Sequence, residues 1–147
     1  MSAARCFVHD IGGSPPKPIT PEGAVQAVLS TDGKSIAAAF TDHTIKTWQI
    51  DRGEPQLVPN LTTDDGGLIA WSEDGKAVFL NKQDGAGSQL KRVEVATGQT
   101  TVLRKVAPPD RAGLLGTQIT SILDDGKSYG YFYYKQLDTL YLFSGLR

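Results

Sequence analysis

The sequence predicts an all-β fold built from repeated antiparallel units, for three reasons. The tripeptide Asp-Gly-Lys occurs three times, at residues 32–34, 74–76 and 125–127. A short apolar run stands on each side of every copy, which is typical of two strands joined by a tight turn. No window keeps apolar residues at helical spacing for three turns, while 16 glycines and 8 prolines interrupt the chain.

The spacing of the copies indicates the size of the repeated unit. The three copies begin at residues 32, 74 and 125. These intervals of roughly 40 to 50 residues match the length of a β-propeller blade. The longer second interval contains the Pro-rich segment 107–115, which we expect to be a loop.

Each unit is expected to be a four-stranded antiparallel meander. The first two strands are expected at 25–29 and 36–40, at 68–71 and 77–80, and at 119–123 and 129–134. Third strands with alternating polarity are expected at 45–50, 90–95 and 140–143. Gly turns at 52–53 and 97–98 then lead to fourth strands at 56–58 and 100–106.

The two ends of the chain supply incomplete units. Cys6–Ile11 and Lys17–Thr20 are expected to be the last two strands of a preceding blade, and the C-terminal unit is expected to have three strands. The chain therefore divides into a partial blade (1–23), two blades (24–61 and 62–107) and an incomplete blade (108–147). Together they form a propeller segment of about three four-stranded antiparallel blades.

Composition argues against several classes of partner and cofactor. With 16 acidic and 15 basic side chains the net charge is -1, so we expect no nucleic-acid binding. The single Cys6 cannot form an internal disulfide, and with His9 and His43 it lacks zinc-site spacing. No apolar run approaches the roughly 18 residues of a membrane span, so we expect no membrane insertion by this segment.

Residue types that often carry chemistry are present but have structural interpretations. Carboxylates pair at 64–65, 73–74 and 124–125, which suggests acid/base or calcium chemistry, yet each pair adjoins a glycine and suits a turn. His43 lies in an expected loop, as a surface residue or as a ligand contact. Because no Gly-x-Ser-x-Gly elbow or phosphate-binding glycine motif occurs, we expect no catalytic residue, no metal and no cofactor.

The aromatic run Tyr129 and 131–134 has two interpretations. It is either a stacking platform for a sugar or peptide, or a set of side chains packed between neighbouring blades, and the second is the more common use.

Residues 68–80, with Trp71, Ser72 and then Asp-Gly-Lys, resemble the repeat of TolB-like (WD40-like) propellers, although Glu73 stands where that repeat has Pro. Residues 138–147 resemble the closing segment of propellers at the C-terminus of certain bacterial serine/threonine kinases. The resemblance implies a propeller that contacts a protein or ligand through its blade loops, and it carries over no catalytic residue.

We therefore expect a non-catalytic binding module, the sensor or scaffold part of a larger protein such as a receptor-type kinase, and extracytoplasmic in that case. The alternatives are the propeller of an oligopeptidase-type serine peptidase and a self-assembling lectin-like propeller. The partner is expected to be a protein or small ligand. A homodimer is one further expectation, in which Lys17–Thr20 of each chain completes the C-terminal blade of the other and gives a six-bladed ring. The alternative expectation is that the missing blades lie in a longer parent protein and that this segment is a monomer or aggregates.

Overall fold

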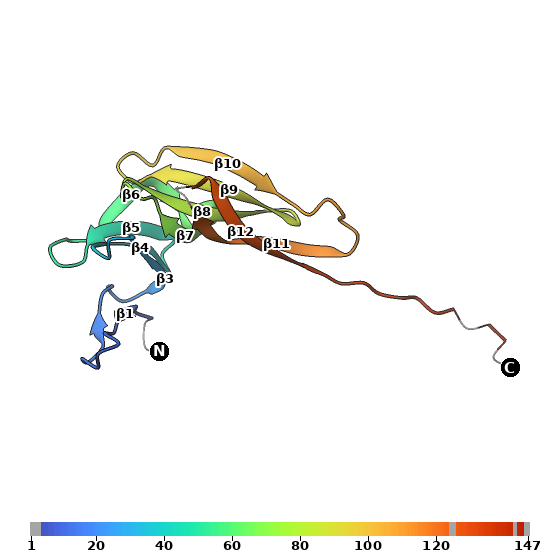
Figure 1. The fold of residues 1–147 in the computed structure, drawn as a ribbon, viewed down its shortest axis with the longest axis horizontal. Coiled ribbons are helices and arrows are strands. Elements are labelled where there is room, and N and C mark those ends of the chain that lie inside the picture. Colours follow the sequence, from blue (N-terminus) through green and yellow to red (C-terminus); the bar gives the residue numbers. More distant parts are fainter. Residues whose placement is uncertain (1–3, 124–125, 143, 146–147) are drawn as a thin grey trace.

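The computed structural model of the protein describes residues 4–123, 126–142 and 144–145. Within them the chain forms two four-stranded antiparallel sheets, with a two-stranded sheet at each end of the stack (Figure 1). The described residues include one short 3-10 helix, η1 (Thr63–Asp65). No helix in this part of the chain is long and apolar enough to cross a membrane.

The first complete sheet contains β3 (Ala24–Leu29), β4 (Ser35–Phe40), β5 (Thr44–Gln49) and β6 (Gln56–Thr62), adjacent in chain order. Strand β4 is apolar on both faces, as expected of a strand covered by a layer on each side. Ala37 and Ala39 face the second sheet, whereas Ile36, Ala38 and Phe40 face the opposite way.

The second complete sheet repeats this order with β7 (Gly67–Trp71), β8 (Ala77–Asp84), β9 (Gly87–Glu94) and β10 (Thr100–Val106). It stacks on the first sheet through one apolar cluster. The buried members are Ala37, Ala39, Ile45, Val58, Leu61, Leu68, Trp71, Val78, Leu80 and Val93.

Two side chains join the innermost strands of the two sheets through three hydrogen bonds. The side-chain amide of Gln26 donates to the Leu68 carbonyl at 2.7 Å, and its oxygen accepts from the Leu68 N–H at 3.0 Å. The Trp71 indole N–H donates to the Val28 carbonyl at 3.1 Å. Gln26 thus bonds the backbone of β7 much as a neighbouring strand would.

A half-sheet packs on each outer face of this pair. At the N-terminal end β1 (Phe7–Val8) pairs with β2 (Lys17–Pro18), and Cys6 and Ile19 beside them pack on the first sheet. At the C-terminal end β11 (Leu114–Leu123) pairs with β12 (Ser128–Lys135), and Ile119 packs on the second sheet. The protein is therefore a stack of four layers.

The all-β prediction is confirmed, and so is the four-stranded antiparallel unit. The N-terminal strands are shorter than the expected Cys6–Ile11 and Lys17–Thr20, because their turn occupies residues 9–16.

The C-terminal unit has two strands among the described residues, where the sequence predicted three. Residues 136–142 form no strand and run away from the body (Figure 1), with Leu140, Tyr141 and Leu142 exposed to 93%, 73% and 92%. Phe143, the end of the expected strand, lies outside the described residues. A third strand beside β12 would carry apolar side chains on both of its faces. Because the described chain has a layer on only one side of β12, one of those faces would stay exposed.

The three Asp-Gly sequences form the tight turns that were expected, each with its glycine at positive φ. Gly33, Gly75 and Gly126 have φ of +69°, +67° and +92°. Glycine reaches this region without the Cβ clash that other residues suffer.

Trp71→Ala should lower the free energy of unfolding by about 3 to 5 kcal/mol, since it empties a buried site and leaves the Val28 carbonyl without its indole donor. Chemical denaturation monitored by circular dichroism measures the change. Leu57→Ala is the control, because Leu57 is exposed and its truncation should stay within about 0.5 kcal/mol. An unchanged midpoint for Trp71→Ala would contradict the placement of this side chain.

Gly75→Val should destabilise the protein by roughly 1 to 3 kcal/mol, because it forces a β-branched residue to a positive φ. Nothing lies within 4 Å of the added Cβ, so the cost is backbone strain. Gly67→Ala tests a glycine that lacks positive φ, and its midpoint should be lowered much less. Equal effects at the two glycines would refute the turn conformation as the cause.

Candidate interaction surface

The Asp-Gly turns are closed by their own side chains. Ser30 Oγ donates to Asp32 Oδ1 at 2.6 Å and accepts from the Ser35 N–H at 2.9 Å, while the Lys34 N–H donates to the same carboxylate oxygen at 3.0 Å. These contacts join the two ends of the turn on either side of Gly33. They lower the pKa of the Asp32 carboxyl, chiefly through the Ser30 hydroxyl.

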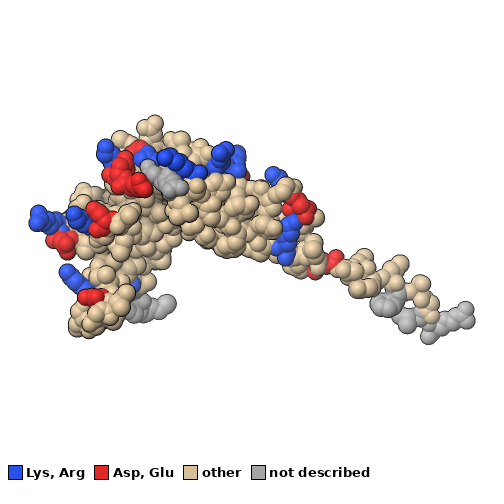
Figure 2. Space-filling model, in the orientation of Figure 1, with Lys and Arg blue, Asp and Glu red and all other residues tan. Residues whose placement is uncertain are grey.

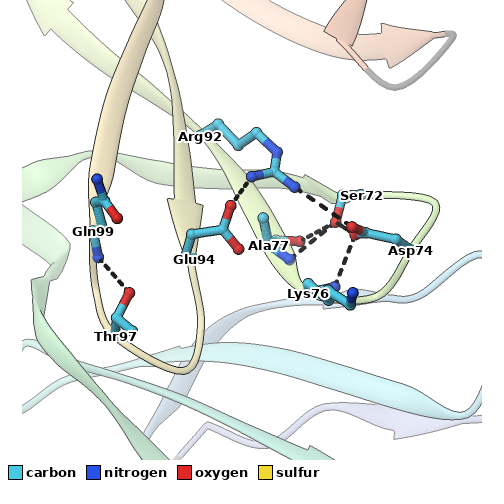
Figure 3. Close-up of polar contacts among 8 residues, drawn as sticks. All are labelled: Ser72, Asp74, Lys76, Ala77, Arg92, Glu94, Thr97 and Gln99. Carbon is cyan, nitrogen blue, oxygen red and sulfur yellow. Dashed lines mark hydrogen bonds and ion pairs between the residues drawn. The ribbon is translucent and has the colours of Figure 1, made fainter.

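The second turn repeats this arrangement (Figure 3). Ser72 Oγ donates to Asp74 Oδ1 at 2.6 Å and accepts from the Ala77 N–H at 2.9 Å. The Lys76 N–H donates to Asp74 at 3.0 Å, and an Arg92 guanidinium nitrogen lies 3.8 Å from the second carboxylate oxygen. The pKa of Asp74 is lowered, first by the Ser72 hydroxyl and then by the Lys76 N–H. A shallow depression between the first two turns is therefore lined by groups that already bond one another.

The third turn departs from this pattern. Leu123 stands where the first two turns have Ser30 and Ser72, and its side chain is exposed. The carboxylate pair Asp124-Asp125 lies outside the described residues. This turn therefore lacks the serine that positions the aspartate in the other two.

Polar side chains at the opposite end of the sheets also bond one another. His43 Nδ1 lies 2.9 Å from Thr63 Oγ1 and 3.8 Å from an Asp64 carboxylate oxygen. Asp65 accepts from the Thr62 N–H at 3.1 Å and so caps the start of η1. Among residues 4–123, 126–142 and 144–145, no three His, Cys, Asp or Glu side chains gather as metal ligands would.

The C-terminal half-sheet presents the aromatic run. Ile119 is opposite Tyr131, and Ile122 is opposite Tyr129, so these tyrosines face the second sheet. Alternation places Phe132 and Tyr134 on the other face, where their rings lie 6.2 Å apart. Tyr129 packs against the apolar cluster of the second sheet, as predicted for side chains between blades. The side chains of residues 131–134 remain 43% to 53% exposed.

The half-sheet is held firmly on the second sheet. The Asn81 side-chain oxygen accepts from the Ile119 N–H at 3.1 Å, and the buried Ser88 hydroxyl donates to the Thr117 carbonyl. Lys135 bonds the Asp110 carboxylate at 2.6 Å and thereby lowers the pKa of Asp110. The aromatic run thus stands on an anchored hairpin.

The free edge of β12 differs from the free outer edges of the complete sheets. Natural edge strands avoid pairing with other chains by carrying proline, charge or irregular backbone. Strand β6 contains Pro59 and has Asn60 at a φ of +54°. Strand β10 carries Arg104 and Lys105 and an irregular register.

Strand β12 has no proline and no charged side chain between Ser128 and Tyr134. Its register with β11 shifts twice, but the extra residue lies on β11 each time, so β12 itself pairs without interruption. In Figure 2 charged side chains lie toward the upper rim and the ends of the body, and the middle of the visible face, over β7, β11 and β12, is free of them. The edge and faces of β12 therefore form the candidate interaction surface.

Some of these features were not predicted from the sequence. The sequence located the aromatic run, but not the two-residue alternation that divides it between faces. Gln26 and Asn81 carried no signal, since an amide that bonds a distant backbone looks like any polar strand residue. Cys6 is half-buried beside the first sheet and His9 is exposed.

The stacked four-stranded meanders are blades of a β-propeller. The structure is similar to that of TolB from Acinetobacter baumannii, with a TM-score of 0.56 and 16% sequence identity over 88% of this chain and 34% of TolB. It is also similar to the β-propeller domain of the Trilobed protease from Pyrococcus furiosus, with a TM-score of 0.45 and 11% identity over 91% of this chain and 48% of that domain. No protein-family model and no curated protein matches the sequence.

The fold is a TolB-like β-propeller, as the residues around Trp71 predicted. The chain spans about a third of the length of TolB. The resemblance of residues 138–147 to kinase propellers finds no counterpart in these comparisons and stays a prediction.

Asp74→Asn should lower stability at neutral pH. The amide oxygen accepts the same hydrogen bonds, but it lacks the negative charge that strengthens them and that attracts Arg92. A lowered folded-state pKa gives stability that is present above the unfolded pKa of about 3.9 and is lost as the pH falls through the folded value. The deficit of the variant should therefore shrink below about pH 4. Thermal midpoints from pH 7 to pH 2 measure it.

Ser72→Ala is the companion variant, since it removes the largest cause of the lowered Asp74 pKa. It should shift the acid limb of the stability curve to higher pH. Curves for Asp74→Asn that run parallel to wild type at every pH would contradict this origin of the shift.

Proposed function

We propose that this β-propeller is a non-catalytic module that binds another protein by adding an extended segment of it to β12. The observation that carries the proposal is the unprotected edge of β12, uncharged and free of proline from Ser128 to Tyr134, beside edges that are blocked. Strand addition gains affinity from main-chain hydrogen bonds and specificity from alternate side chains.

The backbone of β12 is oriented for such an addition. The Gln136 N–H donates to the Gly113 carbonyl, toward β11, at 2.9 Å. Successive residues of a strand direct their backbone groups to opposite edges, so Tyr131, Tyr133 and Lys135 direct theirs to the free edge. The Lys135 side chain donates to the Asp110 carboxylate. This bond fixes the position of the C-terminal end of the β12 edge.

The side chains of β12 offer contacts on both faces of an added strand. Phe132 and Tyr134 stand on the outward face, and Tyr131 and Tyr133 on the face toward the second sheet. Exposed aromatic side chains supply large contact areas at low entropic cost. A partner segment with alternating apolar residues fits this surface.

A receptor-type kinase is the setting that we propose for such a module, supported by the sequence resemblance of residues 138–147. Sequencing the flanking gene tests this setting. An upstream kinase domain with a membrane span would support it, and a downstream domain with a Gly-x-Ser-x-Gly elbow would replace it with the peptidase alternative.

Selection of random peptides on the immobilised full chain tests the binding mode. We expect the selected peptides to alternate apolar residues and to slow hydrogen exchange at the amides of Tyr131 and Tyr133. Tyr133→Pro, which removes one N–H from the free edge, should abolish binding of these peptides, whereas Tyr133→Ala should retain much of it.

Leu57→Lys is a second control, on an exposed apolar side chain of the blocked strand β6. It should leave peptide binding unchanged. Peptides that bind Tyr133→Pro as tightly as wild type, or that protect the loops instead of β12, would overturn the proposed function.

A further inference from the structure

We propose that the strand added to β12 is β1 of a second copy of this chain, so that two chains exchange half-sheets and close a ring of six four-stranded blades. This inference rests on the proposed function and names its partner. It differs from completion by the single strand Lys17–Thr20, because the whole β1–β2 hairpin is donated.

The strand numbers of the two half-sheets are complementary. Each chain has two complete four-stranded sheets, one two-stranded sheet before them and one after them. β2 leads into the first strand of a complete sheet, as β6 and β10 lead into β7 and β11. By this order β1 and β2 take the third and fourth places of a sheet, and β11 and β12 take the first and second. Joined, they make one more four-stranded sheet.

The two half-sheets already occupy the positions that a closed ring requires. One packs on the outer face of the first complete sheet and the other on the outer face of the second. A sheet made from β11–β12 of one chain and β1–β2 of another would therefore touch a complete sheet of each chain. Two such junctions connect four complete sheets, which gives six blades, within the usual range of about four to eight.

The two edges of the N-terminal hairpin differ in whether another strand can pair with them, and only one of them is open. The Ile19 N–H donates to the Cys6 carbonyl, toward β1, so the neighbouring Pro18 nitrogen faces the outer edge of β2. Proline at that edge resembles Pro59 on β6 and prevents further pairing. On β1, Phe7 follows Cys6 and directs its backbone to the free edge. The open edge of this hairpin is therefore that of β1. A strand that pairs with it must also have an open edge, as β12 has.

The surface of a single chain is larger than folding alone requires. A compact monomer of 15.8 kDa exposes about 7,300 Å², whereas this chain exposes 9838 Å². The excess of roughly 2,500 Å² combines the extended residues 136–142 with the open edges and faces of the two half-sheets. Exposed apolar side chains lie on both halves of the proposed junction, with Phe7 and Val8 on β1 and residues 131–134 on β12.

The tail at 136–142 is the other segment of the chain that could cover β12. It forms no strand in the structure, whereas β1 is already paired with β2 and docked beside a complete sheet. Addition of the tail would also leave the outer edge of β1, the edge away from β2, without a partner strand. We therefore assign the edge of β12 to β1.

Light scattering after size exclusion, over a dilution series of the full chain, tests the exchange. Wild type should have twice the chain mass of 15.8 kDa. Phe7→Pro and Tyr133→Pro each remove one N–H that faces a joining edge, and each should halve the observed mass. Phe7→Ala and Tyr133→Ala keep the N–H and should remain dimeric, with circular dichroism confirming the fold of all four variants.

An equimolar mixture of the two proline variants gives the sharpest test. In a mixed pair, the intact β12 of the Phe7→Pro chain meets the intact β1 of the Tyr133→Pro chain. One junction of the mixed pair is whole, while both junctions of either pure pair are broken. The mixture should therefore regain the doubled mass.

A measurement on wild type guards against variants that fail to fold. The amides of Tyr131 and Tyr133 should be protected from hydrogen exchange in the dimer and should lose this protection when dilution separates it. Fast exchange at these amides in a dimeric sample would overturn the proposal.

The other outcomes are equally decisive. A wild type of single-chain mass, or folded proline variants that stay dimeric, would overturn the exchange. A double variant Leu140→Asp and Leu142→Asp that separates the dimer would assign the edge to the tail instead. A monomeric wild type that still binds the selected peptides at β12 would refute the second copy and leave the proposed function standing.

Discussion

The contact between the two complete sheets is the interaction on which the rest of the structure depends. Ten buried apolar side chains meet there, and the Gln26 amide and the Trp71 indole fix how the inner strands lie against each other. A two-stranded sheet is marginally stable in water by itself, so each half-sheet needs the face of a complete sheet to pack on. Both half-sheets are therefore stable only as additions to this central pair.

The pairing pattern within each sheet explains why so much of the fold could be predicted. Every strand of a meander pairs with its neighbour in sequence, and the turn between the first two strands carries a glycine at positive φ in all three copies. Alternating polarity then locates the remaining strands. These signals are local, so residues 32–34 and 74–76 indicated hairpins without any knowledge of the layers.

The features that could not be predicted from the sequence depend on which other strands and layers pack beside a strand. Leu140 and its neighbours have strand-like alternation, but a strand forms only where both a hydrogen-bonding edge and a packing layer are present. The blocked edges of β6 and β10 became informative only when the structure showed them to be outer strands, because Pro59 or Lys105 alone suits a loop equally well. For the same reason the open edge of β12 emerges from comparison with other edges, and not from its own residues.

The two hydrogen bonds between Gln26 and the Leu68 backbone affect how stability is distributed along the chain. Within each sheet, the hydrogen bonds join strands that are neighbours in sequence, whereas these two join residues 42 positions apart. In such stacked repeats, cooperativity passes only through the interfaces between adjacent units. The chain is therefore expected to behave as a short linear array of foldons, coupled at its centre by the apolar cluster together with the Gln26 amide and the Trp71 indole, with its least protected units at the two ends.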